Sequence, residues 1–235
     1  MYSGSMDKQD QQGILLADHD IDEKSVVVVG DIHGCDWGLR KLLAQIIHTG
    51  CQVVFVGDLI DRGEGGRSVL TIVRGICEDP GKWGFSAATC LMGNHEKMAL
   101  DAYCGVDFGL WLQNGGRIDD FTHLSDTGGW GWLNGLPLYY EHGSPVTWGD
   151  DVLSLLITHG SVQPGIPLES QDPEVLYWGR KIQGYSQKHL TVHGHTICQD
   201  GLPLEYSTPT GGVVRLDTGS YHTGIITAIA FREAQ

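Results

Sequence analysis

The stretch SVVVVGDIHG at residues 25–34 decides the fold that the sequence predicts. Its first five residues are a β-branched run, which is typical of a strand buried on both faces. The run gives way to a glycine-flanked turn that carries Asp31 and His33. Apolar residues then recur at helical spacing over residues 37–47, which predicts a helix. A buried strand, a polar turn and a helix therefore form the unit on which the fold is built.

The same unit recurs twice in the first half of the chain. Strands and helices are expected in alternation at Val53–Val56, Ser68–Ile76, Ser86–Met92 and about Lys97–Tyr103. The second strand ends in GDLIDRG (57–63) and the third in GNHE (93–96). This order predicts an α/β fold with a parallel sheet and right-handed crossovers. Since the carboxyl ends of parallel strands share one edge, the three polar turns should meet there.

The rest of the chain has a different pattern. Residues 105–150 hold four tryptophans and two Gly-Gly pairs, and we expect helices and loops that cover one side. Strands then return, and we expect them to pair antiparallel. They are predicted at Asp151–Thr158, Leu190–Val192, Gly212–Leu216 and Gly224–Phe231. His159 follows the first of these strands, and His193 and His195 follow the second.

Length and composition indicate one domain. The chain has 235 residues, of which 41% are hydrophobic, enough for a buried core. We expect a flexible segment over 1–24, because its first residues are polar, and a single domain over 25–235. Whether residues 1–5 are a vector remnant ahead of a second start at Met6 is left open. The segment lacks the basic and apolar regions of a secretion signal, and no apolar run approaches the roughly 18 residues of a membrane span.

The net charge limits the kinds of partner that we expect, and the cysteine content indicates the cellular compartment. Fifteen basic against 29 acidic side chains give a net charge of -14, which argues against nucleic-acid and membrane partners. Positive charge for a phosphate group would then have to come from something other than surface Lys and Arg, and bound metal ions are the obvious candidates. The six cysteines are scattered without a CxxC pair, which is typical of reduced thiols. We therefore expect a cytoplasmic protein.

The side chains at the strand ends suit metal ions. They are carboxylate, imidazole and amide groups without a thiolate, a set that fits Mn²⁺, Fe or Zn²⁺. The candidates are Asp31, His33, Asp58, Asn94, His159, His193 and His195. One ion would not use them all, whereas two ions sharing the carboxylate of Asp58 would. Such a pair, about 3.5–4 Å apart, can hold a hydroxide and clamp two substrate oxygens for in-line attack on a phosphate ester.

Four further residues fit this chemistry. His95 follows Asn94 directly and is a candidate general acid for the leaving oxygen. Asp61 could orient it, and Arg62 and Arg180 could grip phosphoryl oxygens. Taken singly, each motif is better explained by an ordinary turn, and the tryptophans by the core. Five polar turns at strand ends, with complementary ligand types, are difficult to explain by turn chemistry alone.

The motif series resembles a known family. GDIHG (30–34), GDLIDRG (57–63), GNHE (93–96), THG (158–160) and GHT (194–196) are similar to those of the calcineurin-type metallophosphoesterases. Within them, the chain most resembles the small bacterial and bacteriophage branch of the phosphoprotein phosphatases. WLQNGG (111–116) and LDTGSYHTG (216–224) add to this likeness, which covers about residues 26–230.

The resemblance implies a fold, a site and an activity. The fold would have four layers, with two mixed β-sheets forming a sandwich flanked by helices. One metal would be held by Asp31, His33 and Asp58, and the other by Asp58, Asn94, His159 and His195. His193 would be a neighbour only. His95 would be the general acid backed by Asp61, and Arg62 and Arg180 would bind phosphate. The activity would be hydrolysis, typically supported by Mn²⁺, of phosphoserine, phosphothreonine and sometimes phosphotyrosine.

The substrate and some other properties stay open. The family's protein phosphatases commonly have Arg before GNHE, where this chain has Met92. Symmetrical dinucleoside tetraphosphatases of the same family often have an apolar residue there, but a different acidic residue after the His, so Glu96 favours a protein phosphatase. A scaffold without catalysis is disfavoured, because His95, Asp61 and Arg62 are all present. The oligomeric state, and whether residues 105–150 close over the cleft, are not predicted.

Overall fold

The first three predicted units form one half of the sheet. The computed structural model describes residues 10–234, so the questions about residues 1–5 and Met6 lie outside the described residues. Strands β2 (Ser25–Val29), β3 (Gly50–Phe55) and β4 (Phe85–Cys90) pair in parallel in the order β4-β3-β2. Helices α1 (Asp36–Ile46), α2 (Gly66–Glu78) and α3 (Asn94–Tyr103) follow these strands. The βαβαβα prediction is therefore confirmed.

The second half of the sheet corrects one prediction. Its strands are β7 (Asp151–Thr158), β8 (His189–His193), β9 (Leu204–Thr208) and β10 (Gly211–Arg215). Strand β8 pairs in parallel with both β7 and β10, so the expectation of antiparallel pairing is wrong for β8. The link from β7 to β8 contains helix α7 (Pro173–Trp178), and such a crossover returns the chain to the end where it started. The β9–β10 hairpin is antiparallel.

Strand β11 (Ile225–Glu233) lies at the centre of the assembly. It pairs antiparallel with β2 and with β6 (Val146–Trp148), and β6 pairs with β7. The two halves are thereby connected through β6. Strand β5 (Tyr139–Glu141) adds to β7 and, like β6, lies in the 105–150 region where only helices and loops were expected.

Strand β1 (Gln12–Leu16) corrects the expectation of a flexible segment for its five residues. It pairs in parallel with β11, from Gln12 against Ile225 to Leu16 against Ile229. Gln11, directly before it, accepts hydrogen bonds at its Oε1 from the backbone N–H groups of Trp37 and Gly38 at the start of α1. These contacts come from distant parts of the chain, so the local polar composition did not predict them.

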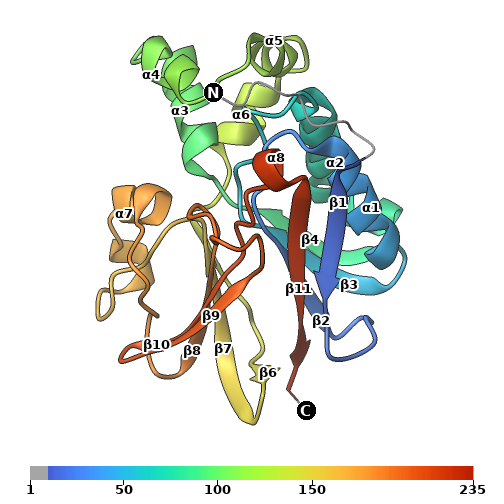
Figure 1. The fold of residues 1–235 in the computed structure, drawn as a ribbon, viewed down its shortest axis with the longest axis vertical. Coiled ribbons are helices and arrows are strands. Elements are labelled where there is room, and N and C mark those ends of the chain that lie inside the picture. The colour runs from blue at the N-terminus through green and yellow to red at the C-terminus, as the bar shows by residue number, and fades with distance from the viewer. Residues whose placement is uncertain (1–9, 235) are drawn as a thin grey trace.

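The two halves of the sheet face each other (Figure 1). Hydrophobic side chains form the core between them. Along β2, Val27 and Val29 pack toward the helices, whereas Val26 and Val28 pack against the other half. This alternation is the expected period of two along a strand. The buried residues between the halves include Val54, Val56, Leu155, Ile157, Leu190, Val192, Val214 and Phe231.

Helices cover both outer faces and complete the four layers. The side chains of Leu39, Leu42 and Ile46 on α1 pack on the β2 half, and Leu176 on α7 packs against Leu156 of the β7 half. Helices α3, α4 (Phe108–Gln113), α5 (Ile118–Asp126) and α6 (Gly129–Asn134) lie together at the top of Figure 1. The structure is therefore the predicted α/β sandwich of mixed sheets flanked by helices. Within residues 10–234, no helix combines the length and apolar character that a membrane crossing needs.

Candidate active site

The strand-end turns place non-glycine residues in the left-handed region of backbone space. Asp58, Asp61 and Arg62 follow β3 with φ values of 50°, 69° and 64°, and His33 and His195 follow β2 and β8 with 43° and 62°. Each such residue is destabilising by about 1–2 kcal/mol unless its surroundings hold it. This concentration of strained residues at one edge marks a site at which side-chain direction matters.

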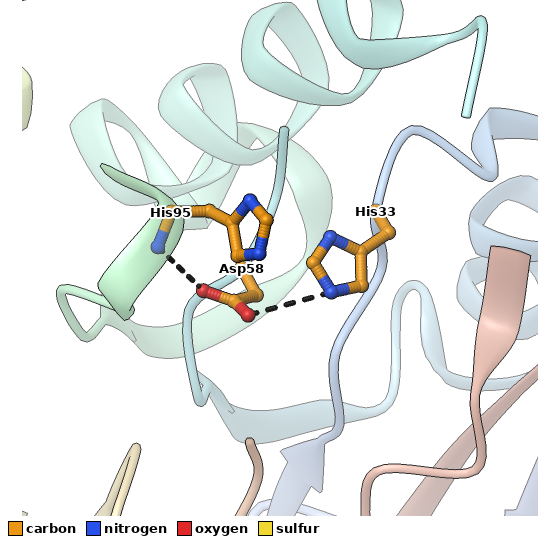
Figure 2. A group of neighbouring side chains, drawn as sticks. All are labelled: His33, Asp58 and His95. Carbon is orange, nitrogen blue, oxygen red and sulfur yellow. Dashed lines mark hydrogen bonds and ion pairs between the residues drawn. The ribbon is translucent and has the colours of Figure 1, made fainter. Parts of the chain in front are cut away.

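Asp58 lies at the centre of the site (Figure 2). Its Oδ2 is 3.4 Å from Nε2 of His33, and its Oδ1 accepts the backbone N–H of His95 at 3.0 Å. Nδ1 of His33 bonds the carbonyl oxygen of Ile60 at 3.0 Å, which directs Nε2 toward Asp58. The three side chains His33, Asp58 and His95 are buried and could hold a metal ion.

A second group shares Asp58. Its Oδ1 is 3.4 Å from Nε2 of His159, whose Nδ1 bonds the carbonyl oxygen of Val56 at 3.0 Å. Oδ1 of Asn94 is 2.9 Å from both Nε2 of His159 and Nδ1 of His195. Asp58, His159 and His195 form the other group that could hold an ion among residues 10–234. Two candidate ligand groups therefore meet at one carboxylate, the arrangement expected of Asp58.

Asp31 lies beside these groups. Both of its carboxylate oxygens accept the backbone N–H of His195, at 3.2 and 3.0 Å. Burial, together with the charges of Asp217 and Asp58, raises the pKa of Asp31 well above its ordinary value. In the first group, the structure brings His95 rather than Asp31 next to His33 and Asp58.

The donor set fits divalent cations. Burial raises the pKa of Asp217 to about 6, with repulsion from Asp58 adding to the effect, so the site gathers carboxylates that repel one another. Burial lowers the pKa of His195 to about 3, which keeps its imidazole neutral and able to coordinate. Nε2 of His195 is buried and has no hydrogen-bond partner within the described part of the chain. A cation bound at this edge of the sheet would offset the repulsion between the carboxylates. It would also give Nε2 of His195 a partner.

His95 is paired as the sequence predicts. Its Nδ1 is 2.8 Å from Oδ2 of Asp61, and both side chains are buried. Burial alone lowers the pKa of His95, but the charge of Asp58 and the bond to Asp61 outweigh this and raise it. The indole N–H of Trp111 also donates to Asp61, at 3.0 and 2.9 Å from its two oxygens. Trp111 was interpreted as core, and it is fully buried, but it also takes part in this polar contact.

The two candidate phosphate-binding arginines lie in different settings. Nη1 of Arg62 donates to Nε2 of His33 at 2.9 Å, and its guanidinium carbon is 4.5 Å from the ring centre of Tyr221. Arg180 is exposed, and its charge is close enough to contribute to the lowered pKa of His195. Both cations therefore lie near the candidate ligand groups.

His193 lies beside the site but in neither ligand group. Its Nδ1 is 2.6 Å from Oγ1 of Thr158, and its Nε2 is buried without a partner among the described residues. Burial lowers its pKa to about 4. Its position next to the site agrees with the interpretation of His193 as a neighbour.

Sequence reasoning missed the role of Glu96. Its carboxylate accepts the backbone N–H groups of Asp58, Leu59 and Gly93, at 2.7, 2.8 and 3.0 Å. It therefore ties the turn after β3 to the start of α3. The capping-box position three residues after Gly93 was the available signal. Met92, which was read as a substrate marker, is buried, and its sulfur lies 3.6 Å from the hydroxyl of Tyr177.

The chain matches one protein-family model and several curated proteins. The family model described as calcineurin-like phosphoesterase matches residues 24–199. The chain is 43% identical over 104 residues to serine/threonine-protein phosphatase 1 of Salmonella typhimurium, covering 43% of each protein. It is 30% identical over 214 residues to the symmetrical bis(5'-nucleosyl)-tetraphosphatase of Pectobacterium carotovorum, covering 88% of this chain and 66% of the relative. The matches thus span less than two thirds of these relatives.

A solved structure has a related fold. The cold-active protein-tyrosine phosphatase of a psychrophilic Shewanella species superposes with a TM-score of 0.55 at 17% identity. The match covers 93% of this chain and 77% of that structure. At this identity, the likeness concerns the fold alone.

Proposed function

Because the chain belongs to the calcineurin-like phosphoesterase family, we propose that it is a metal-dependent phosphatase acting on phosphoserine and phosphothreonine, and also phosphotyrosine, in proteins. The observation that carries this proposal is the buried carboxylate of Asp58, whose two oxygens lie 3.4 Å from the imidazoles of His33 and His159. A shared carboxylate between two ions is the usual arrangement for in-line cleavage of phosphate esters. We further propose that residues 25–235 act as one domain and that the protein works in the cytoplasm.

The proposed ligands divide between two ions. Asp31, His33 and Asp58 would hold one, and Asp58, Asn94, His159 and His195 the other. We propose Mn²⁺ as the metal, and Fe or Zn²⁺ would also suit oxygen and imidazole ligands. When bound, such ions supply positive charge and a water of lowered pKa. The charge of Asp58 contributes to the raised pKa of the buried Asp31, which supports the assignment of Asp31 to the first ion.

The chain's own residues perform the other tasks. Asp61 accepts Nδ1–H of His95, and when the imidazole is protonated, its Nε2–H is the proton that it gives to the leaving oxygen. Arg62 and Arg180 would bind the phosphoryl oxygens, since a guanidinium pairs with two oxygens at once. The ring of Tyr221 under Arg62 supports the direction of that guanidinium.

A symmetrical dinucleoside tetraphosphatase is the second candidate. It is favoured by the 30% identity to the Pectobacterium enzyme over most of this chain, and by the apolar residue Met92 before GNHE. On sequence alone, Glu96 favours a protein phosphatase over this candidate. The Glu96 carboxylate, however, accepts three backbone N–H groups of the turns, so its presence has a structural reason that does not depend on the substrate.

A side-by-side assay tests the choice. Purified protein with Mn²⁺ is offered phosphoserine, phosphothreonine and phosphotyrosine peptides and, separately, diadenosine tetraphosphate. We expect the higher kcat/KM for the phosphopeptides. Fast cleavage of the dinucleotide with negligible release of phosphate from peptides would select the second candidate. Asp58→Asn, prepared identically, controls for contaminating phosphatases and should be inactive on every substrate.

A further inference from the structure

The contact between Trp111 and Asp61 has a geometry that ordinary core packing does not require. The indole N–H of Trp111 lies within 3.0 Å of both oxygens of Asp61, and the Trp111 side chain is 0% exposed. A buried indole N–H needs an acceptor, and here that acceptor is the carboxylate that bonds Nδ1 of His95. Trp111, Asp61 and His95 therefore form one chain of hydrogen bonds.

The segment around Trp111 also forms hydrogen bonds with the backbone of the turn after β3, which carries Asp61 and Arg62. The N–H of Arg62 donates to the carbonyl oxygen of Gly115 at 2.9 Å, and the N–H of Asp61 donates to Oδ2 of Asp120 at 3.1 Å. Asp61 and Arg62 are consecutive left-handed residues, so both need such support. The WLQNGG motif and Asp120 thus hold the backbone of the turn that carries Asp61.

The glycines of the motif permit this close approach. A Cβ on Gly116 would lie 2.5 Å from the Trp111 ring, and one on Gly115 would lie 2.9 Å from Cγ of Arg62. Gly115 also has a φ of 95°, which disfavours any side chain. The aromatic rings of Phe108 and Phe121 also pack against the indole, with centroids 5.4 and 5.5 Å from that of Trp111.

We propose that Trp111 is a positioning residue of the phosphatase reaction, which orients the Asp61 carboxylate so that it accepts Nδ1–H of His95 and directs Nε2–H of the protonated imidazole toward the leaving oxygen. This proposal rests on the proposed function, because it assigns Trp111 to the same proton transfer. Without the indole N–H, the carboxylate can rotate away from His95, and the imidazole loses its fixed direction. The leaving oxygen then departs without well-placed proton donation.

The test is Trp111→Phe, which removes the N–H and keeps an aromatic ring. We expect kcat for an alkyl phosphate, such as a phosphoserine peptide, to fall about ten-fold or more, the usual effect of losing a hydrogen bond to a charged group. KM should change less than about two-fold, because substrate binding does not involve the indole. With 4-nitrophenyl phosphate, whose leaving group hardly needs a proton, kcat should fall much less.

Trp130→Phe is the matched control. Its indole N–H donates to Oγ of Ser125 at 3.1 Å, and its ring lies 4.8 Å from Phe121 in the same aromatic cluster. This variant loses an indole hydrogen bond and ring area without touching Asp61. Its kinetics should therefore match those of the original protein on both substrates.

A double-mutant cycle separates positioning from general stability. If Trp111 acts through Asp61, then adding Trp111→Phe to Asp61→Asn should not lower kcat for the alkyl phosphate further. Additive losses, or equal losses with the two leaving groups, would overturn the proposal. Should Trp111→Phe not fold, a benzothienylalanine at position 111 gives the same test, because sulfur replaces the N–H in a ring of nearly the same shape. Normal alkyl phosphate turnover by either folded variant would also overturn it.

The proposed function fails in a different way. If the original protein with Mn²⁺ hydrolyses neither alkyl phosphates nor 4-nitrophenyl phosphate, the phosphatase proposal is lost before any variant is compared. If the original protein is active and Trp111→Phe behaves as Trp130→Phe does, only the role of Trp111 is lost. Metal content, measured by elemental analysis, should be the same in all these variants.

Discussion

Some side chains in the site contact several neighbouring residues at once. The two oxygens of Asp58 accept the His95 backbone N–H and face the imidazoles of His33 and His159. Its own backbone N–H is held by Glu96. A substitution at such a residue therefore changes ligand chemistry and backbone geometry together, so the cleaner functional tests lie at residues with fewer neighbours.

His95 offers such a test. His95→Asn should lower turnover of an alkyl phosphate by a factor of about 10²–10⁴, the usual contribution of a general acid. The loss with 4-nitrophenyl phosphate should be smaller, and elemental analysis should find the metal content retained. His142→Asn is the matched control, because His142 is also buried and bonds a carboxylate, that of Glu233, at 2.9 Å. Equal turnover by His95→Asn and the original protein on the alkyl phosphate would remove His95 from the mechanism.

The residues of the site divide into those that sequence can reveal and those that it cannot. Asp31, Asp58 and His95 stand in short motifs directly after strands, so the topology alone brings them together. Trp111 and Asp120 reach the site from a separate pair of helices, through contacts 50 and 59 positions away from Asp61. No periodicity in a sequence specifies such a contact, so these two residues could be found only from the structure.

At the scale of elements, the long buried strands were predictable and the short ones were not. Ser25–Val29 and Asp151–Thr158 are observed with their predicted bounds, because each is a continuous apolar or alternating run. Strands β5, β6 and β9 have three to five residues with partly exposed side chains, so their patterns are too short to read. The parallel pairing of β8 depends on how α7 crosses the sheet, which is a property of the packed fold.

The packing of β1 on α1 gives a prediction for an element that the sequence did not reveal. A Cβ on Gly13 would lie 2.6 Å from the carbonyl oxygen of Gly38. Gly13→Ala should therefore lower the free energy of unfolding by about 1–3 kcal/mol, as overpacked sites usually do. The measurement is urea unfolding at fixed Mn²⁺ concentration.

Gly131→Ala is the control for this prediction. Gly131 lies in helix α6, and a Cβ there would meet no atom within 4 Å. The change should leave stability unaltered or raise it by up to about 1 kcal/mol, because alanine favours helices. An unchanged urea midpoint for Gly13→Ala would contradict the close packing of β1.

At the scale of the whole molecule, buried carboxylates couple metal binding to stability. Burial and repulsion from Asp58 raise the pKa of Glu96 to about 7 and that of Asp217 to about 6. A carboxyl whose pKa is raised by folding binds its proton more tightly in the folded state, so stability without metal should fall as pH rises from about 4 to 7. Bound cations would offset this loss.

Thermal unfolding measures this coupling. At pH 7, Mn²⁺ should raise Tm above its value in EDTA, with about 2.7 kcal/mol of stabilisation per site at a hundred-fold excess over Kd. The difference should shrink at pH 4, where Glu96 and Asp217 are protonated. Asp58→Asn removes the proposed shared ligand and should lose most of the rise. Equal Tm values in Mn²⁺ and EDTA at pH 7 would argue against metal binding at this edge of the sheet.

The central position of β11 also determines when, during synthesis, β2 can pair with it. Val28 on β2 has Ile229 on β11 as its register partner, about 200 residues later in the chain. At about 5–20 residues per second, the ribosome needs roughly 10–40 s to make the intervening segment. Throughout that interval, the flank of β2 that β11 will cover is open to other polypeptides. The pairing of β2 with β11 is therefore a late step of folding during synthesis.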